Sequence, residues 1–111
     1  MLEHQVKTAV AQAYAAAAAA SDDYYTRVFN RKDTGACGFA SVKTYVKGNT
    51  AIARALKKHG FSRSYPAGYE LYNPSGMRVQ SVDVLYAGAV RAAELLTEQL
   101  GVMFFAVSRL D

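Results

Sequence analysis

The sequence predicts one α+β domain, in which a long alanine-rich helix precedes a four-stranded antiparallel sheet with two helices in the ferredoxin-like βαββαβ order. A strand-helix-strand pattern occurs twice, over 36–65 and again over 69–107. Each helix of this pattern ends at a glycine, Gly60 or Gly101, and an aromatic or apolar residue follows at once, as when a chain leaves a helix through a left-handed cap. The 111 residues, 51% of them hydrophobic, suit a single domain, so we assign 1–29 to the helix and 36–111 to the βαββαβ region.

The first element is a helix over 1–29 with a narrow stripe of small apolar side chains. The stripe recurs at three-, four- or seven-residue spacing and comprises Leu2, Val6, Ala9, Ala13, Ala17, Tyr24 and Val28. Small side chains allow another helix or a sheet to approach closely. We therefore expect this helix to cover the sheet face that the other helices leave open, in its own subunit or in a partner. Ser21, Asp22 and Asp23 suit a break in the helix, and residues 30–35 suit a connecting turn.

The next elements are a strand over 36–46 and a short helix over 49–59. Along the strand, the aromatic and polar residues Phe39, Ser41, Lys43 and Tyr45 alternate with small apolar ones. Gly48 ends the strand and Asn49 is the expected helix cap. Helical spacing then turns Ile52, Ala55, Leu56 and His59 inward and Arg54, Lys57 and Lys58 outward.

The second half of the chain begins with a hairpin. Strands over 61–65 and 69–72 flank Pro66-Ala67-Gly68, and Asn73-Pro74-Ser75-Gly76 has the residues of a tight turn. Ser81 is the expected cap of a helix over 81–100, with Asp83 in its first turn. The final strand over 102–107 is apolar on both faces, which predicts that something covers each face.

Composition excludes several classes of site. One cysteine, Cys37, forms no internal disulfide, and His4 and His59 lack zinc-ligand spacing, so we expect neither a metal nor a cofactor. The apolar run over 9–20 is too short to cross a bilayer, and no secretory signal precedes it, so we expect a cytoplasmic protein that does not engage a membrane. No residues form an evident catalytic set, so we expect no enzymatic activity. A small enzyme that uses Cys37 or the loop at Lys47 is the remaining enzymatic alternative.

Two groups of residues are candidates for binding. Phe39, Tyr45 and Tyr69, with Lys43 and Arg63 nearby, could stack nucleic-acid bases on an open sheet face. The alternative, favoured by the two-sided apolarity of 102–107, is a second core beneath the N-terminal helix.

The second group surrounds a strand-to-helix loop. Lys47, Gly48, Asn49 and Thr50 bring backbone amides, a lysine and a hydroxyl together where an anion could bind, although a turn and a helix cap need the same residues. Arg54, Lys57 and Lys58 extend it into a basic patch, for which the alternative is a solvated helix face. The net charge of +4 also favours anionic partners.

Several segments resemble small conserved proteins of unassigned function that are encoded by tailed bacteriophages. These segments are Ala36-Cys37-Gly38-Phe39-Ala40, the Lys47 to Thr50 loop, Asn73-Pro74-Ser75-Gly76, Gln80-Ser81-Val82-Asp83 and Ser108-Arg109-Leu110-Asp111. The resemblance implies a phage-encoded accessory or counter-defence protein in the cytoplasm of a bacterial host. It carries over no functional residues.

These observations predict a small non-enzymatic binding protein. Its expected partner is a host protein, a nucleic acid or an anionic nucleotide, held through a basic surface. The alternative is a structural module that forms a homodimer or higher oligomer through the N-terminal helix and an exposed sheet face.

Overall fold

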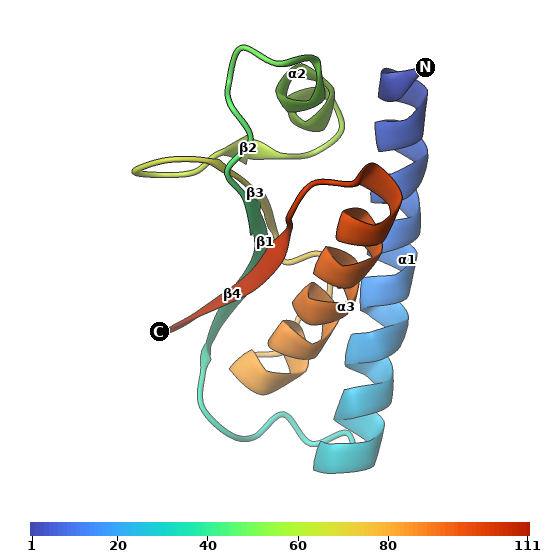
Figure 1. Ribbon diagram of the computed structural model, residues 1–111. Helices are drawn as coiled ribbons and strands as arrows, with labels where there is room; N and C mark the ends of the chain where they lie inside the picture. Colours follow the sequence, from blue (N-terminus) through green and yellow to red (C-terminus); the bar gives the residue numbers. More distant parts are fainter.

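Three α-helices and a four-stranded antiparallel sheet make up the fold, as the computed structural model describes for residues 1–111 (Figure 1). In chain order the elements are α1 (Leu2–Phe29), β1 (Gly38–Thr44), α2 (Ala51–Lys58), β2 (Ser62–Arg63), β3 (Tyr69–Tyr72), α3 (Val82–Leu100) and β4 (Phe105–Leu110). The strands are arranged in the order β2-β3-β1-β4. The α+β class and the order of elements along the chain are therefore confirmed.

The register of β1 determines which side chains share a sheet face. Val42 lies opposite Leu71 of β3 and Ala106 of β4, and both Val42 and Leu71 are buried in the core. The neighbouring residue Lys43 lies opposite Glu70 and Phe105. Because successive side chains of a strand point to opposite faces, the second row lies on the face away from the core.

All three helices lie on one face of the sheet. The α3 helix packs on β1 and β4, and α1 packs along α3 and also contacts α2 (Figure 1). One buried cluster joins Val6 of α1, Leu56 of α2, Leu96 of α3 and Val42 of β1. The expectation that the N-terminal helix covers the far sheet face is therefore wrong, because α1 forms a layer behind α3 instead.

Small residues explain why α1 packs against α3. A Cβ atom on Gly88 of α3 would lie 2.9 Å from the Ala17 carbonyl oxygen, so the two backbones approach closely. At the same crossing the buried Ser21 hydroxyl donates a hydrogen bond to the Val84 carbonyl at 2.7 Å. Because this bond satisfies the serine across the interface, α1 continues without the expected break to Phe29.

The caps of α2 and α3 differ from the predicted ones. Thr50, rather than Asn49, caps α2, and its hydroxyl oxygen accepts a hydrogen bond from the Ala53 amide at 3.3 Å. Ser81 occupies the cap position of α3, but its buried hydroxyl has no partner. The Asp33 carboxylate accepts hydrogen bonds from the backbone amides of Gln80 and Ser81 instead, at 2.9 and 3.0 Å.

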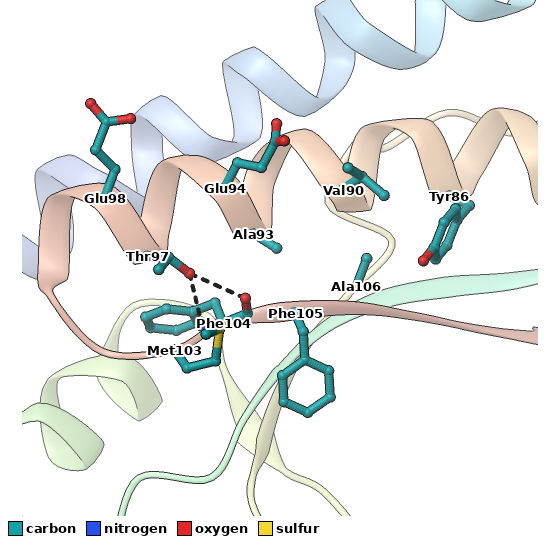
Figure 2. A pocket seen from close by; sticks show the side chains of 10 residues that line it. All are labelled: Tyr86, Val90, Ala93, Glu94, Thr97, Glu98, Met103, Phe104, Phe105 and Ala106. Carbon is teal, nitrogen blue, oxygen red and sulfur yellow. Dashed lines mark hydrogen bonds between the residues drawn. The ribbon is translucent and has the colours of Figure 1, made fainter.

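The hairpin and the tight turn are confirmed, whereas the last strand begins later than predicted. Ser64 and Gly68 close the β2–β3 loop by a backbone hydrogen bond, and Gly76 bonds to Asn73 across the turn. Residues 102–104 form a link in which Phe104 enters the core, held by two hydrogen bonds to the Thr97 side chain (Figure 2). Residues 102–107 are apolar on both faces partly because 102–104 belong to this link and not to the strand. Their apolarity therefore does not require that both faces of β4 be covered. None of the helices is both long and apolar enough to cross a bilayer.

Candidate binding surface on the open sheet face

The sheet face away from the helices carries aromatic and basic side chains. It is called the open sheet face below, and its members are Phe39, Ser41, Lys43, Tyr45, Glu70, Tyr72, Phe105, Val107 and Arg109. Two of its rings are largely exposed, with 58% of Tyr45 and 57% of Tyr72 accessible. Single exposed rings are common on protein surfaces, whereas a contiguous group of rings on one face is typical of a binding surface.

Phe39, Tyr72 and Arg109 form one cluster on this face, the Phe39 cluster. The ring centroids of Phe39 and Tyr72 are 6.2 Å apart, and the Arg109 guanidinium lies 5.2 Å from the Phe39 centroid. Phe39 and Arg109 are directly opposed in the β1–β4 ladder, which places the cation over the ring. The cluster thus offers aromatic surface beside a positive charge.

Tyr45, Phe105 and Lys43 form a second cluster, the Tyr45 cluster. The centroids of Tyr45 and Phe105 are 5.5 Å apart, and the Lys43 ammonium lies 5.2 Å from the Tyr45 centroid. Lys43 opposes Phe105 in the ladder, so this cluster repeats the combination of two rings and one cation. The open sheet face therefore presents the same chemistry at two positions.

A depression of about 220 Å³ lies beside the Phe39 cluster, with Lys43 and Glu70 in its lining. Glu70 accepts a hydrogen bond from the Ser64 hydroxyl at 3.0 Å. Its carboxylate can accept hydrogen bonds from amino groups, while the lysine and arginine can contact phosphates. The rings can stack on planar groups. These capacities together match a ligand that contains both bases and phosphates.

Strand alternation in the sequence predicts part of this surface. Phe39, Lys43 and Tyr45 lie on it, but Tyr69 does not, because it is 4% exposed and belongs to the core. Arg63 opposes Tyr69 in the β2–β3 ladder and therefore lies on the helix-bearing face. The prediction that Tyr69 and Arg63 join the open face is wrong.

The remaining aromatic and basic members, Tyr72, Phe105 and Arg109, were missed. The alternation within β3 contains a signal for Tyr72, since Leu71 points inward and Glu70 outward. Phe105 and Arg109 could be placed on this face only once the bounds of β4 were known. A strand predicted to end at Val107 leaves Arg109 outside the sheet.

The predicted basic patch lies on α2 and the preceding loop, apart from the open sheet face. Lys58 forms an ion pair with Glu3 of α1 at 2.8 Å, and this contact holds the pKa of the Glu3 carboxyl below its ordinary value. Arg54 donates to the Asn49 carbonyl at 3.4 Å, whereas Lys57 forms no ion pair. The candidate cations are thus divided between two surfaces.

The loop from Lys47 to Thr50 uses its polar groups internally. The Thr50 hydroxyl donates to the Lys47 carbonyl at 2.6 Å and accepts from the Ala53 amide, and the Thr50 amide also donates to Lys47. A Cβ on Gly48 would lie 2.9 Å from the Tyr69 hydroxyl. These contacts fit the capping interpretation of the loop, and Gly48 fits a close approach to the core tyrosine.

Cys37 is exposed, and its thiol lies 3.5 Å from the Gln80 side-chain oxygen. His59 contacts Glu3 at 3.5 Å instead of the cysteine.

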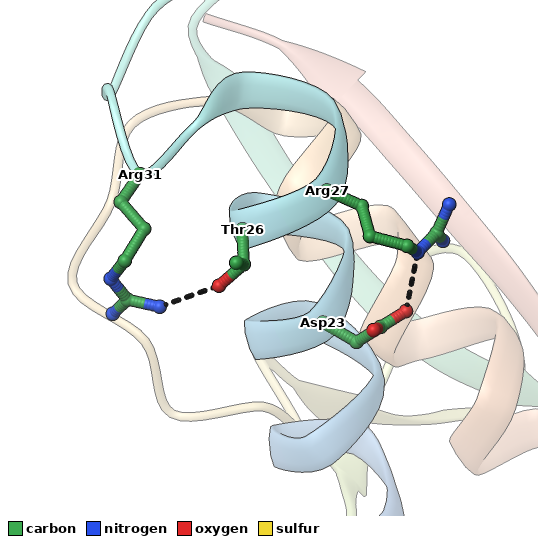
Figure 3. Close-up of polar contacts among 4 residues, drawn as sticks. All are labelled: Asp23, Thr26, Arg27 and Arg31. Atoms are coloured by element: carbon green, nitrogen blue, oxygen red, sulfur yellow. Dashed lines mark hydrogen bonds and ion pairs between the residues drawn. The ribbon is translucent and has the colours of Figure 1, made fainter.

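Near the end of α1, Asp23 pairs with Arg27 at 2.8 Å on the exposed helix surface (Figure 3). No three histidine, cysteine, aspartate or glutamate side chains gather where they could hold a metal ion.

No family model, curated protein or solved structure matches this chain. The resemblance to small phage proteins therefore stays a prediction.

Proposed function

We propose that this protein is a non-enzymatic binding protein whose open sheet face binds single-stranded nucleic acid. The observation that carries the proposal is the pair of clusters, each with two aromatic rings and one cation, on a face that no helix covers. Rings stack on bases of any sequence, and neighbouring cations neutralise the backbone phosphates. This combination is typical of surfaces that bind single strands.

The spacing of the clusters favours a chain over a single nucleotide. Phe39 and Lys43 are four residues apart on β1, which corresponds to ~13 Å along an extended strand. One base cannot stack in both clusters, whereas successive bases of an oligonucleotide can. A duplex is a poorer ligand because its bases are already stacked and paired.

We also propose that the sheet region has the ferredoxin-like arrangement. Support comes from the strand order, which reads β4-β1-β3-β2 from the opposite edge, and from the βαββαβ succession of elements. In the RNA-recognition variant of that arrangement the open face carries the stacking rings. The cytoplasm of a bacterial host is the compartment that we propose for this activity.

Fluorescence anisotropy with a labelled single strand of about twelve nucleotides tests the proposal. Tyr45→Ala and Tyr72→Ala should each weaken binding about 5- to 150-fold, since stacking on one base contributes ~1–3 kcal/mol. Lys43→Gln should reduce the slope of log affinity against log salt by about 0.7, the value for one phosphate contact on a single strand.

Matched variants on the helix side provide controls. Lys57→Gln removes an exposed cation of α2, and Tyr14→Phe changes only the hydroxyl of a ring that is 39% exposed on α1. Neither should change affinity more than about twofold. Equal binding of a duplex, or unchanged affinity in both Tyr45→Ala and Tyr72→Ala, would show that the open face is not the site.

A further inference from the structure

The β4 strand leaves one edge of the sheet without a hydrogen-bonding partner. It is six residues long and pairs only with β1, whereas the opposite edge is the two-residue strand β2. The Asp111 amide donates to the Cys37 carbonyl at 3.0 Å. In an antiparallel pair the backbone groups of every second residue bond to the same neighbour, so Phe105, Val107 and Arg109 face β1 as Asp111 does. The amides and carbonyls of Ala106, Ser108 and Leu110 therefore point to the free edge.

This edge lacks the features by which proteins block strand pairing. No proline or lysine occurs in β4, and its one charged residue, Arg109, belongs to the open sheet face. A six-residue edge of this kind is a template for pairing with another strand. Leu110 at its end is 68% exposed, and its side chain lies on the same sheet face as that of Ala106.

An apolar groove of about 540 Å³ runs between α3 and the start of β4. Tyr86, Val90 and Ala93 line it from α3, and Met103 and Ala106 lie on the other side (Figure 2). A strand added at the β4 edge would place alternate side chains over this groove. It would therefore fill the groove and satisfy the free backbone groups in one step.

The complementary features of the groove and the edge are all present on this chain. If two β4 strands pair antiparallel with Ser108 opposite Ser108, Leu110 of each copy lies opposite Ala106 of the other, above the groove. Asp111 of each copy then lies opposite Phe105 of the other, and that Phe105 in turn lies opposite Lys43 of its own β1. The acidic end of each strand is thus on the same sheet face as a lysine of the other copy, one strand further in.

The helices offer a second matched pair. Tyr86 and Glu94 both line the groove and are two helical turns apart on α3. A twofold axis near Val90 would bring the Tyr86 phenol of one copy toward the Glu94 carboxylate of the other, where the phenol can donate a hydrogen bond. Such reciprocity is a property of a twofold interface between identical chains.

We propose that a second copy of this chain docks at the β4 edge and forms a continuous eight-stranded sheet. Antiparallel pairing in this register keeps the two open sheet faces on the same side. Insofar as the proposed function holds, the dimer doubles the length of the binding surface, and each copy contributes its two clusters. The dimer itself rests on the free edge, the groove and the matched side chains, and not on nucleic-acid binding.

Size-exclusion chromatography with light scattering, performed on the full chain without nucleic acid, tests this proposal. The parent chain should show twice the mass of one chain. Ser108→Pro removes an amide that points to the free edge without removing a bond to β1, and Leu110→Asp places a charge above the groove. Each should raise the dimer dissociation constant at least tenfold, whereas Val28→Asp, which alters an apolar residue of α1 that is 50% exposed, should leave it unchanged.

A covalent readout keeps the test independent of the folding of those variants. In a Cys37→Ser background, Ser108→Cys should form an intermolecular disulfide on mild oxidation, and Val28→Cys should not. A monomeric parent chain at about 100 µM, or a dimer that persists in both Ser108→Pro and Leu110→Asp, would overturn the proposal. Oligonucleotide binding by the monomeric variants is measured separately, so loss of the dimer and loss of binding are distinguishable.

Discussion

At the scale of single residues, Asp33 holds the start of α3 from a turn 47 residues earlier in the chain. Its carboxylate accepts from the backbone amides of Gln80 and Ser81, just before α3, whereas a Ser81 cap would have accepted from an amide inside the first turn. A local cap is inferred from spacing, but a cap supplied from a distant turn depends on the tertiary fold. Sequence patterns therefore predict where α3 starts better than they predict which side chains hold that start in place.

Asp33→Ala should lower the free energy of unfolding by about 1–3 kcal/mol, because it leaves the Gln80 and Ser81 amides just before α3 without a charged acceptor. Chemical denaturation monitored by circular dichroism measures the change. Asp23→Ala serves as the comparison, since it removes a carboxylate from an exposed pair with Arg27 and should cost ~0.5 kcal/mol or less. Equal losses in the two variants would contradict the capping role.

Single residues also decide how much of the open sheet face could be predicted. Alternation in β1 identified Phe39, Lys43 and Tyr45 correctly as neighbours on one face. In β3, tyrosines stand at both ends of a four-residue strand, so one must face the core and the other the open side. The prediction placed Tyr69 on the open face, but Tyr69 shares a face with Leu71, two residues along, and Leu71 is buried in the core.

At the scale of elements, the order of helices and strands followed from periodicity and from glycine and proline signals. The position of α1 did not, because a stripe of alanines fits closely against either a helix or a sheet. The deciding feature is Gly88 on α3, which makes room for the α1 backbone near Ala17. That glycine is recognisable in the sequence, but its partner depends on which helix crosses it.

The contact between α1 and α2 predicts a dependence of stability on alkaline pH. Burial raises the pKa of the Tyr14 phenol above its ordinary value of 10.0, and its hydroxyl lies beside Gly60 at the end of α2. The folded chain then retains this proton more tightly than the unfolded chain, so stability is unaffected below pH 10 and falls as the pH rises above it. Tyr14→Phe should show a smaller loss between pH 9 and 11.

Urea denaturation at several pH values measures this effect. Tyr65→Phe is the control, since that ring is almost fully exposed. Because lysines also titrate in this range, the comparison uses the difference between the two variants rather than either curve alone. Identical alkaline losses in both variants would mean that burial of Tyr14 does not couple to folding.

At the scale of the whole molecule, one layer of strands and two layers of helices leave the sheet with a covered and an open face (Figure 1). The sequence pattern predicts that α1 covers this open face. Since α1 lies behind α3, its apolar stripe is used inside the chain. The stripe is therefore no longer available for the oligomer that was proposed to form through this helix.

Two glutamate substitutions in α1 distinguish internal packing of the stripe from packing between chains. Ala13 is fully buried, whereas Ala15, two residues away, is exposed. Ala13→Glu should destabilise the folded chain by about 3 kcal/mol or more, because it overfills the core and buries a charge. Ala15→Glu should change stability by ~0.5 kcal/mol or less. Thermal unfolding combined with light scattering measures stability and mass together. If α1 instead joined two chains, Ala13→Glu would reduce the mass at unchanged monomer stability, which contradicts the packing against α3.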